Sequence, residues 1–236
     1  MKNYFALLLI VSGLVVFESS ATEGDKYVSS CLQRVADGET IEVDRVNLAP
    51  CTESYVNERP AKYRLTKRDG SIHIATSIYF EWGGEDVERE NSLALLDHSK
   101  SCIENFLARY GLIADLTFFK DTGWVDRDFR SDHVVRLHKR IRANAENWPL
   151  FAQGAYAIGE ASRCGIHIHE FLHLLGLFDT YPVLDKYGEK ICPLRRVENL
   201  DDIMNNSDTS DPKYLRLYPY AIKSILGPLC NSGEFL

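Results

Sequence analysis

Hydrophobic and polar residues alternate in two neighbouring blocks of the chain and predict a β-hairpin. Tyr63 and Leu65 alternate with polar residues, and the alternation resumes over residues 72–80 after the pair Asp69-Gly70. A period of two places successive side chains on opposite faces of a strand, and Asp-Gly is a frequent hairpin turn. The pattern therefore predicts two antiparallel strands, of which the second is long.

Further along the chain the hydrophobic period becomes that of a helix. Apolar residues recur at helical spacing over residues 95–110, and Gly111 follows as a stop signal. Three apolar segments after it are typical of strands: 112–119, 134–141 and 155–158. The order of strands, one long helix and strands predicts a sheet with packed helices, either α/β or α+β, and we take α+β.

The next segment combines an apolar helix with side chains that bind metals. His169 and His173 are four residues apart, so on a helix both project from one face. Glu170 lies beside the first histidine, where it can act as general base toward a water that a metal activates. The surrounding residues are apolar, and burying such polar groups is costly unless they have partners.

Two residues after this helix complete a pattern with three ligands. Gly176 allows the helix to break, and Asp179 can then return as a carboxylate ligand. Two imidazoles and one carboxylate with an open position are typical of catalytic zinc. The alternative is a core helix with hydrogen-bonded histidines and a surface aspartate. Under that alternative the HExxHxxGxxD spacing would be a coincidence, and this full pattern is rare in chance sequence.

The segment resembles the zinc signature of metzincin-type endopeptidases whose third ligand is Asp, as in snapalysin and the immune-inhibitor-A type of bacterial secreted proteases. The resemblance implies a metzincin-like α+β fold. This fold has an upper lobe, in which a twisted mixed sheet carries a backing helix and an active-site helix, and a small irregular C-terminal lobe. It also implies a methionine in a tight turn near the metal, for which Met204 is the candidate. The resemblance spans residues 150–206 at most, and the sharp matches are residues 169–179 and Met204.

The resemblance also suggests a tyrosine that donates to the oxyanion. Some metzincins carry a tyrosine two residues after the methionine, but here that position is Asn206. Tyr181, two residues after Asp179, matches a tyrosine of snapalysin-like enzymes and is our candidate; a packing role on the exit loop is the alternative. Three further tyrosines stay open as candidates: Tyr214, Tyr218 and Tyr220.

The amino terminus has the pattern of a secretory signal peptide. Lys2 is followed by an apolar run over residues 5–17, and small residues stand at Ser19 and Ala21. A run of 13 residues is too short for a helix that crosses a bilayer, which needs about 20. We expect cleavage after Ala21 and no stable membrane anchor afterwards. Residues 22–60 are then an N-terminal extension or short propeptide, and residues 61–236 the zinc peptidase domain.

Cysteine usage agrees with export from the cytoplasm. All six cysteines lie after the signal peptide, and in an exported chain they predict up to three disulfides with 15 possible pairings. The CxxC spacing is absent, which argues against a cysteine zinc site or a dithiol redox centre.

Charge narrows the class of partner. The 236 residues carry 27 Lys and Arg against 34 Asp and Glu, a formal net charge of −7. Nucleic-acid affinity comes mostly from cationic side chains, so nucleic acid is not an expected partner.

We therefore expect a secreted zinc endopeptidase acting on protein or peptide substrates. His169, His173 and Asp179 are its predicted zinc ligands and Glu170 its general base; His167 is expected to pack or to support the ligands without binding the metal. Two alternatives remain. One is a gluzincin-type peptidase with Glu198 as third ligand, and the other is a non-catalytic, zinc-containing binding or toxin-like module.

Overall fold

The computed structural model describes ten segments of the chain: residues 23–48, 58–82, 89–120, 130–138, 154–157, 163–180, 183–184, 190–192, 201–205 and 212–231. The predicted signal peptide and the residues Cys51, Tyr181, Glu198 and Asn206 lie outside these described segments.

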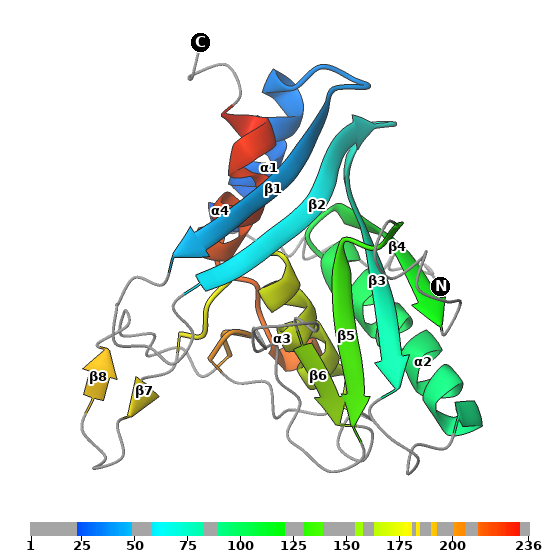
Figure 1. The fold of residues 1–236 in the computed structure, drawn as a ribbon. Helices are drawn as coiled ribbons and strands as arrows, with labels where there is room; N and C mark the ends of the chain where they lie inside the picture. Colours follow the sequence, from blue (N-terminus) through cyan, green and yellow to red (C-terminus); the bar gives the residue numbers. More distant parts are fainter. Residues whose placement is uncertain are drawn as a thin grey trace, which may run out of the picture.

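Six strands of the described segments form one mixed sheet, shown in Figure 1. Its strands are β1 (Thr40–Leu48), β2 (Glu58–Arg68), β3 (Ser71–Trp82), β4 (Leu112–Lys120), β5 (His133–His138) and β6 (Gly154–Ala157). A separate antiparallel pair is formed by β7 (Val183–Leu184) and β8 (Lys190–Cys192).

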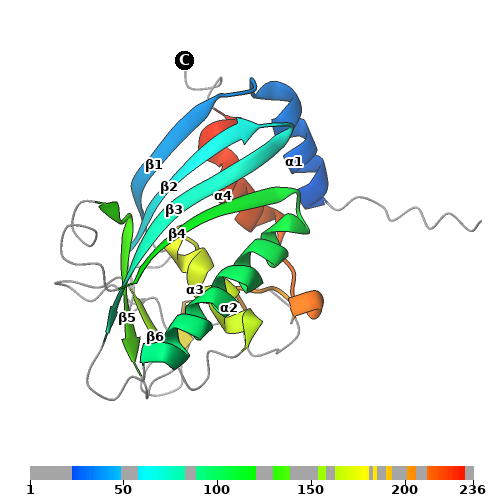
Figure 2. The same cartoon turned by 90° about the vertical axis from the view of Figure 1, so that its right-hand side faces the viewer.

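The α-helices of the described segments lie on one side of the curved sheet, as Figures 1 and 2 show. They are α1 (Glu23–Arg34), α2 (Arg89–Ala108), α3 (Cys164–Leu174) and α4 (Pro219–Cys230), and a short 3₁₀ helix, η2 (Pro212–Tyr214), precedes α4. Helix α3 packs between α2 and strand β2. The α+β prediction, with a mixed sheet and a backing helix, is confirmed.

The predicted hairpin is present as β2 and β3. The two strands are antiparallel, with Arg68 opposite Ser71. Asp69 and Gly70 have φ of 53° and 72°, and two consecutive positive φ angles are what a two-residue hairpin turn requires. Side chains on the core face are fully buried, at Leu65 in β2 and at Ile72, Ile74 and Ile78 in β3.

Strand β3 is the centre of the sheet. One of its edges pairs with β2 over residues 71–75 and then with β5 over residues 78–82. Its other edge pairs with β4, parallel to it, after the chain has crossed over through α2. The parallel pairs β3–β4, β3–β5 and β5–β6 make this half of the sheet different from the antiparallel half formed by β1 and β2.

The N-terminal segment is built into the same core. Strand β1 pairs with β2 along its whole length, from Thr40 to Leu48. Helix α1 packs against α4, and a disulfide joins Cys31 to Cys230. A division of the chain at residue 60 therefore cuts through β2 and through a continuous sheet. Within the described residues, no helix combines the length and the apolar character needed to cross a membrane.

Candidate metal centre

Helix α3 carries the two histidines and the glutamate through the core of the molecule. Every residue of 165–177 is buried, including His169, Glu170 and His173, which are 4–5% exposed. The apolar neighbours Phe171, Leu172 and Ile168 explain the burial, since they form a helix that is apolar almost all round.

The end of α3 turns the chain back toward the histidines. The Gly176 N–H donates to the His173 carbonyl at 2.9 Å, and the Leu177 N–H donates to the Leu172 carbonyl at 3.2 Å. This pair of hydrogen bonds is the Schellman ending of a helix, which requires a left-handed residue, and Gly176 has φ +87°. Asp179 is thereby brought back to the face from which the two histidines project.

Three ligand atoms converge at this point. The Nε2 atoms of His169 and His173 are 3.1 Å apart, and Asp179 Oδ1 lies 3.0 Å from the first and 3.2 Å from the second. In a tetrahedral zinc site with bonds of about 2.0–2.1 Å, ligand atoms stand about 3.3 Å apart. The three atoms thus already have the mutual spacing of three corners of a zinc tetrahedron.

Each imidazole is oriented by a backbone carbonyl. His169 Nδ1 lies 2.8 Å from the Ile203 oxygen, and His173 Nδ1 lies 2.7 Å from the Leu177 oxygen. Because a carbonyl oxygen only accepts, both Nδ1 atoms carry the proton and donate. The Nε2 lone pairs are therefore left for a metal, which is the usual arrangement around a metal-binding histidine.

Burial and neighbouring charges shift the pKa values of the three ligand groups in different directions. Burial works to lower the pKa of His169, but its hydrogen bond to Asp179 and the charge of Glu170 outweigh this effect and raise the pKa to about 9. Burial lowers the pKa of His173 to about 4. Burial also favours a higher pKa for Asp179, yet the two imidazoles beside it hold its pKa well below the usual range. An ionised carboxylate with two imidazoles is thus a donor set suited to a divalent cation.

Residues distant in sequence complete the site. Arg59 of β2, 7% exposed, places Nη2 3.9 Å from the second oxygen of Asp179. Asn47 of β1 donates from Nδ2 to the Gly176 carbonyl at 2.8 Å. Sequence reasoning missed both, because neither belongs to a local motif.

The segment around Met204 forms the expected tight turn. The Asn205 N–H donates to the Asp202 carbonyl at 2.9 Å, and Met204 is fully buried. The Thr180 N–H donates to the Met204 carbonyl at 3.0 Å, so the turn holds the chain directly after Asp179.

The buried Asp202 side chain stabilises this turn by accepting hydrogen bonds. It is fully buried and accepts hydrogen bonds from Thr180 Oγ1 at 3.2 Å, Tyr220 OH at 2.9 Å and the Met204 N–H at 3.1 Å. Burial raises the pKa of this carboxyl group. Sequence reasoning did not single out Asp202.

Of the candidate tyrosines, three can be placed and Tyr181 cannot. Tyr214 is 62% exposed. The hydroxyls of Tyr218 and Tyr220 donate to Asp201 at 2.8 Å and to Asp202 at 2.9 Å. The oxyanion role of Tyr181 stays a prediction.

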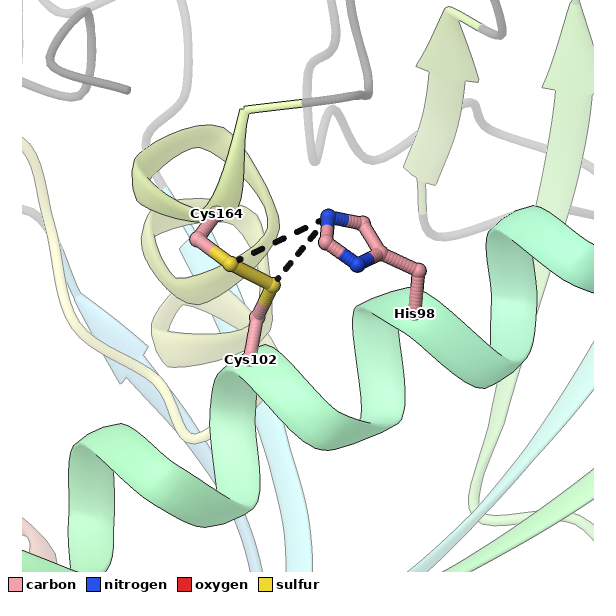
Figure 3. Close-up of side chains that lie close together, drawn as sticks. All are labelled: His98, Cys102 and Cys164. Carbon is pink, nitrogen blue, oxygen red and sulfur yellow. Dashed lines mark hydrogen bonds between the residues drawn. A yellow bond between two sulfur atoms is a disulfide. The ribbon is translucent and has the colours of Figure 1, made fainter. Parts of the chain in front are cut away.

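His167 packs away from the three ligand atoms. It is 1% exposed, its ring contacts that of His98 edge to face at 5.8 Å, and burial lowers its pKa to about 4. A second disulfide, Cys102–Cys164, fastens the first residue of α3 to α2, and the His98 ring lies beside it (Figure 3). The start of the helix that carries both histidines is thus covalently braced.

No family model matches this chain, and no curated protein is similar to it in sequence. Among solved structures, high choriolytic enzyme 1, a hatching enzyme zinc-protease from the medaka fish Oryzias latipes, aligns with a TM-score of 0.37 and 11% identity. That alignment covers 65% of this chain and 88% of the other.

Proposed function

We propose that the protein is a secreted zinc-dependent endopeptidase. The observation that carries this proposal is the convergence of His169 Nε2, His173 Nε2 and Asp179 Oδ1, 3.0–3.2 Å apart, with Glu170 buried beside the first ligand. A structural zinc site has no need of a buried glutamate next to an open coordination position.

Zinc held by these three residues would polarise the carbonyl of the scissile bond and make the attacking water more acidic. Glu170 accepts the proton that the water loses and donates it to the nitrogen of the departing amine. The carbonyls of Ile203 and Leu177 keep both imidazoles in the tautomer that leaves Nε2 free to bind. Arg59 places a positive charge 3.9 Å from the outer oxygen of Asp179. Tyr181 remains our candidate for the group that donates to the oxyanion.

Replacing Glu170 with Gln tests the general base. The amide keeps the size of the side chain but cannot take up a proton, so we expect unchanged zinc content and a fall in kcat/KM of about 10²–10⁴-fold. Zinc is measured by elemental analysis, and cleavage is measured on an unfolded protein in the presence and absence of a chelator. Glu104→Gln is the matched control, since Glu104 lies on α2 in an ion pair with Lys100 that is 40% exposed. Near-normal activity of the Glu170→Gln protein would refute the assigned role.

The choice of third ligand is tested by a pair of alanine variants. Asp179→Ala should lose zinc, because Asp179 Oδ1 lies within 3.2 Å of both imidazoles. Glu198→Ala should keep it. The opposite result would indicate the gluzincin arrangement, and a zinc-loaded wild-type protein that cleaves nothing would favour the non-catalytic module.

A further inference from the structure

A second group of metal-binding atoms lies where helix α2 meets the start of α3. His98 Nε2 is 3.5 Å from Cys102 Sγ and 3.9 Å from Cys164 Sγ. Figure 3 shows the imidazole edge turned toward both sulfur atoms, which are joined as a disulfide. Among the described residues, two groups of this kind are found. One is formed by these three atoms, and the other is the histidine–aspartate centre.

The geometry around this disulfide is that of a chelate. His98 and Cys102 are four residues apart on α2, so their side chains lie one turn apart on one face. Cys164 is the first residue of α3, and a helix N-terminus stabilises a thiolate. In a tetrahedral zinc site with Zn–S of about 2.3 Å and Zn–N of about 2.05 Å, nitrogen and sulfur stand about 3.6 Å apart. The two nitrogen–sulfur distances are already close to this value, so only the sulfur–sulfur bond has to open.

The two cysteines differ in their access to a reductant. Cys164 is half-buried, whereas Cys102 is 4% exposed. One thiolate of a dithiol attacks Cys164 Sγ, and Cys102 leaves as a thiolate beside the His98 ring. The second thiol then displaces Cys164, so that the dithiol becomes a disulfide and both cysteines become thiols. The two electrons come from the dithiol, and the two sulfur atoms end with one proton each.

We propose that the reduced pair, together with His98, binds a divalent zinc ion and releases the two thiol protons. Two thiolates and one imidazole form a donor set that zinc favours over magnesium or calcium. Helices α2 and α3 are then cross-linked in either redox state, by the disulfide when oxidised and by the ion when reduced. This site is separate from the proposed catalytic centre and does not depend on the peptidase assignment.

Cobalt(II) distinguishes the two sites by spectroscopy. The histidine–aspartate centre offers no sulfur, so a sulfur-to-cobalt charge-transfer band in the near ultraviolet reports only a cysteine site. We expect the mature chain, residues 22–236, to show this band after reduction with a phosphine and addition of cobalt(II), and not before reduction. Zinc added afterwards should remove the band.

Three variants make the result specific. The double variant Cys102→Ser, Cys164→Ser should lose the band, and His98→Ala should weaken cobalt binding at least tenfold. The double variant Cys31→Ser, Cys230→Ser should keep the band, since that pair lies at the opposite helices α1 and α4. A band that survives in the Cys102/Cys164 variant, or binding unchanged by His98→Ala, would overturn the proposal. So would a reduced wild-type protein with no band.

Thermal unfolding measures whether the ion replaces the cross-link. Zinc should raise the Tm of the reduced wild-type protein more than that of the reduced Cys102→Ser, Cys164→Ser protein. Equal shifts would contradict the cross-link. A reduced wild-type protein that stays unfolded with zinc present would contradict it too.

Discussion

Gly176 is the residue at which backbone conformation and crowding act together. Its φ of +87° is one that side-chain-bearing residues rarely adopt. A Cβ at this position would stand 2.8 Å from the Ala61 Cβ and would also collide with the Asn47 amide nitrogen. Residues of strands β1 and β2 thus pack closely against the turn that brings Asp179 back to the histidines.

Gly176→Ala is therefore expected to cost more than the strain of the backbone. We expect a loss of about 3 kcal/mol in the free energy of unfolding, from positive φ and overpacking together, with weaker zinc binding. Urea denaturation and a zinc titration against a chromophoric chelator measure both.

Gly38→Ala is the control for this substitution. Gly38 has φ +84° but meets nothing within 4 Å of an added Cβ, so only the backbone cost of about 1 kcal/mol remains. Equal losses in the two variants would show that the contacts with Ala61 and Asn47 do not matter.

At the scale of elements, the turn over residues 201–205 links α3 to α4. Its Ile203 carbonyl orients His169, and its Asp202 carboxylate accepts from Tyr220 near the start of α4. The turn thus links one proposed zinc ligand, His169, to the Tyr220 hydroxyl of α4.

Two tyrosine variants separate this linkage from a general loss of hydrogen bonding. Tyr220→Phe removes a hydrogen bond to buried Asp202, and we expect zinc affinity to fall roughly tenfold, as for other groups that support metal ligands. Tyr218→Phe removes a similar bond to Asp201, whose side chain is 37% exposed, and should leave zinc affinity unchanged. The same chelator competition measures both, and equal effects would argue against a special role for Asp202.

The elements show which parts of the site follow from sequence patterns. Histidines four residues apart and an aspartate after a glycine lie on one helix and its exit, so their meeting depends on local geometry alone. Asn47 reaches Gly176 across 129 residues of chain, and no hydrophobic period records such a contact. The Cys102–Cys164 pair bridges 62 residues from two helices, which is why a search for CxxC spacing did not predict this group of ligand atoms.

At the scale of the whole molecule, the two ends of the described chain are fastened to each other. Helices α1 and α4 pack together, Lys223 Nζ lies 2.8 Å from Glu23 Oε1, and the disulfide Cys31–Cys230 closes a separation of 199 residues. Because β1 follows α1 and pairs with β2, the N-terminal segment stabilises the sheet that supports the metal centre.

Removing the Cys31–Cys230 disulfide should therefore destabilise the entire fold. Chain-entropy estimates for so long a loop give about 5 kcal/mol, and measured losses for native disulfides are about 2–5 kcal/mol. We expect the double variant Cys31→Ser, Cys230→Ser to lose free energy of unfolding within that range, as measured by urea denaturation. Lys223→Ala, which removes the exposed ion pair with Glu23 and the contact of Lys223 Nζ with the Tyr27 ring at 5.9 Å, should cost much less than the loss of the disulfide. A double serine variant as stable as Lys223→Ala would contradict this view of the disulfide.

The same disulfide makes a closed covalent ring of the polypeptide between residues 31 and 230. Cutting a ring once opens it without dividing it. One hydrolysed peptide bond anywhere in this span, whether made by another protease or by a second copy of the chain, leaves a single molecule. Its mass on a non-reducing gel is unchanged, and its two fragments stay at high effective concentration. A nicked chain therefore separates into pieces only when a reductant is present.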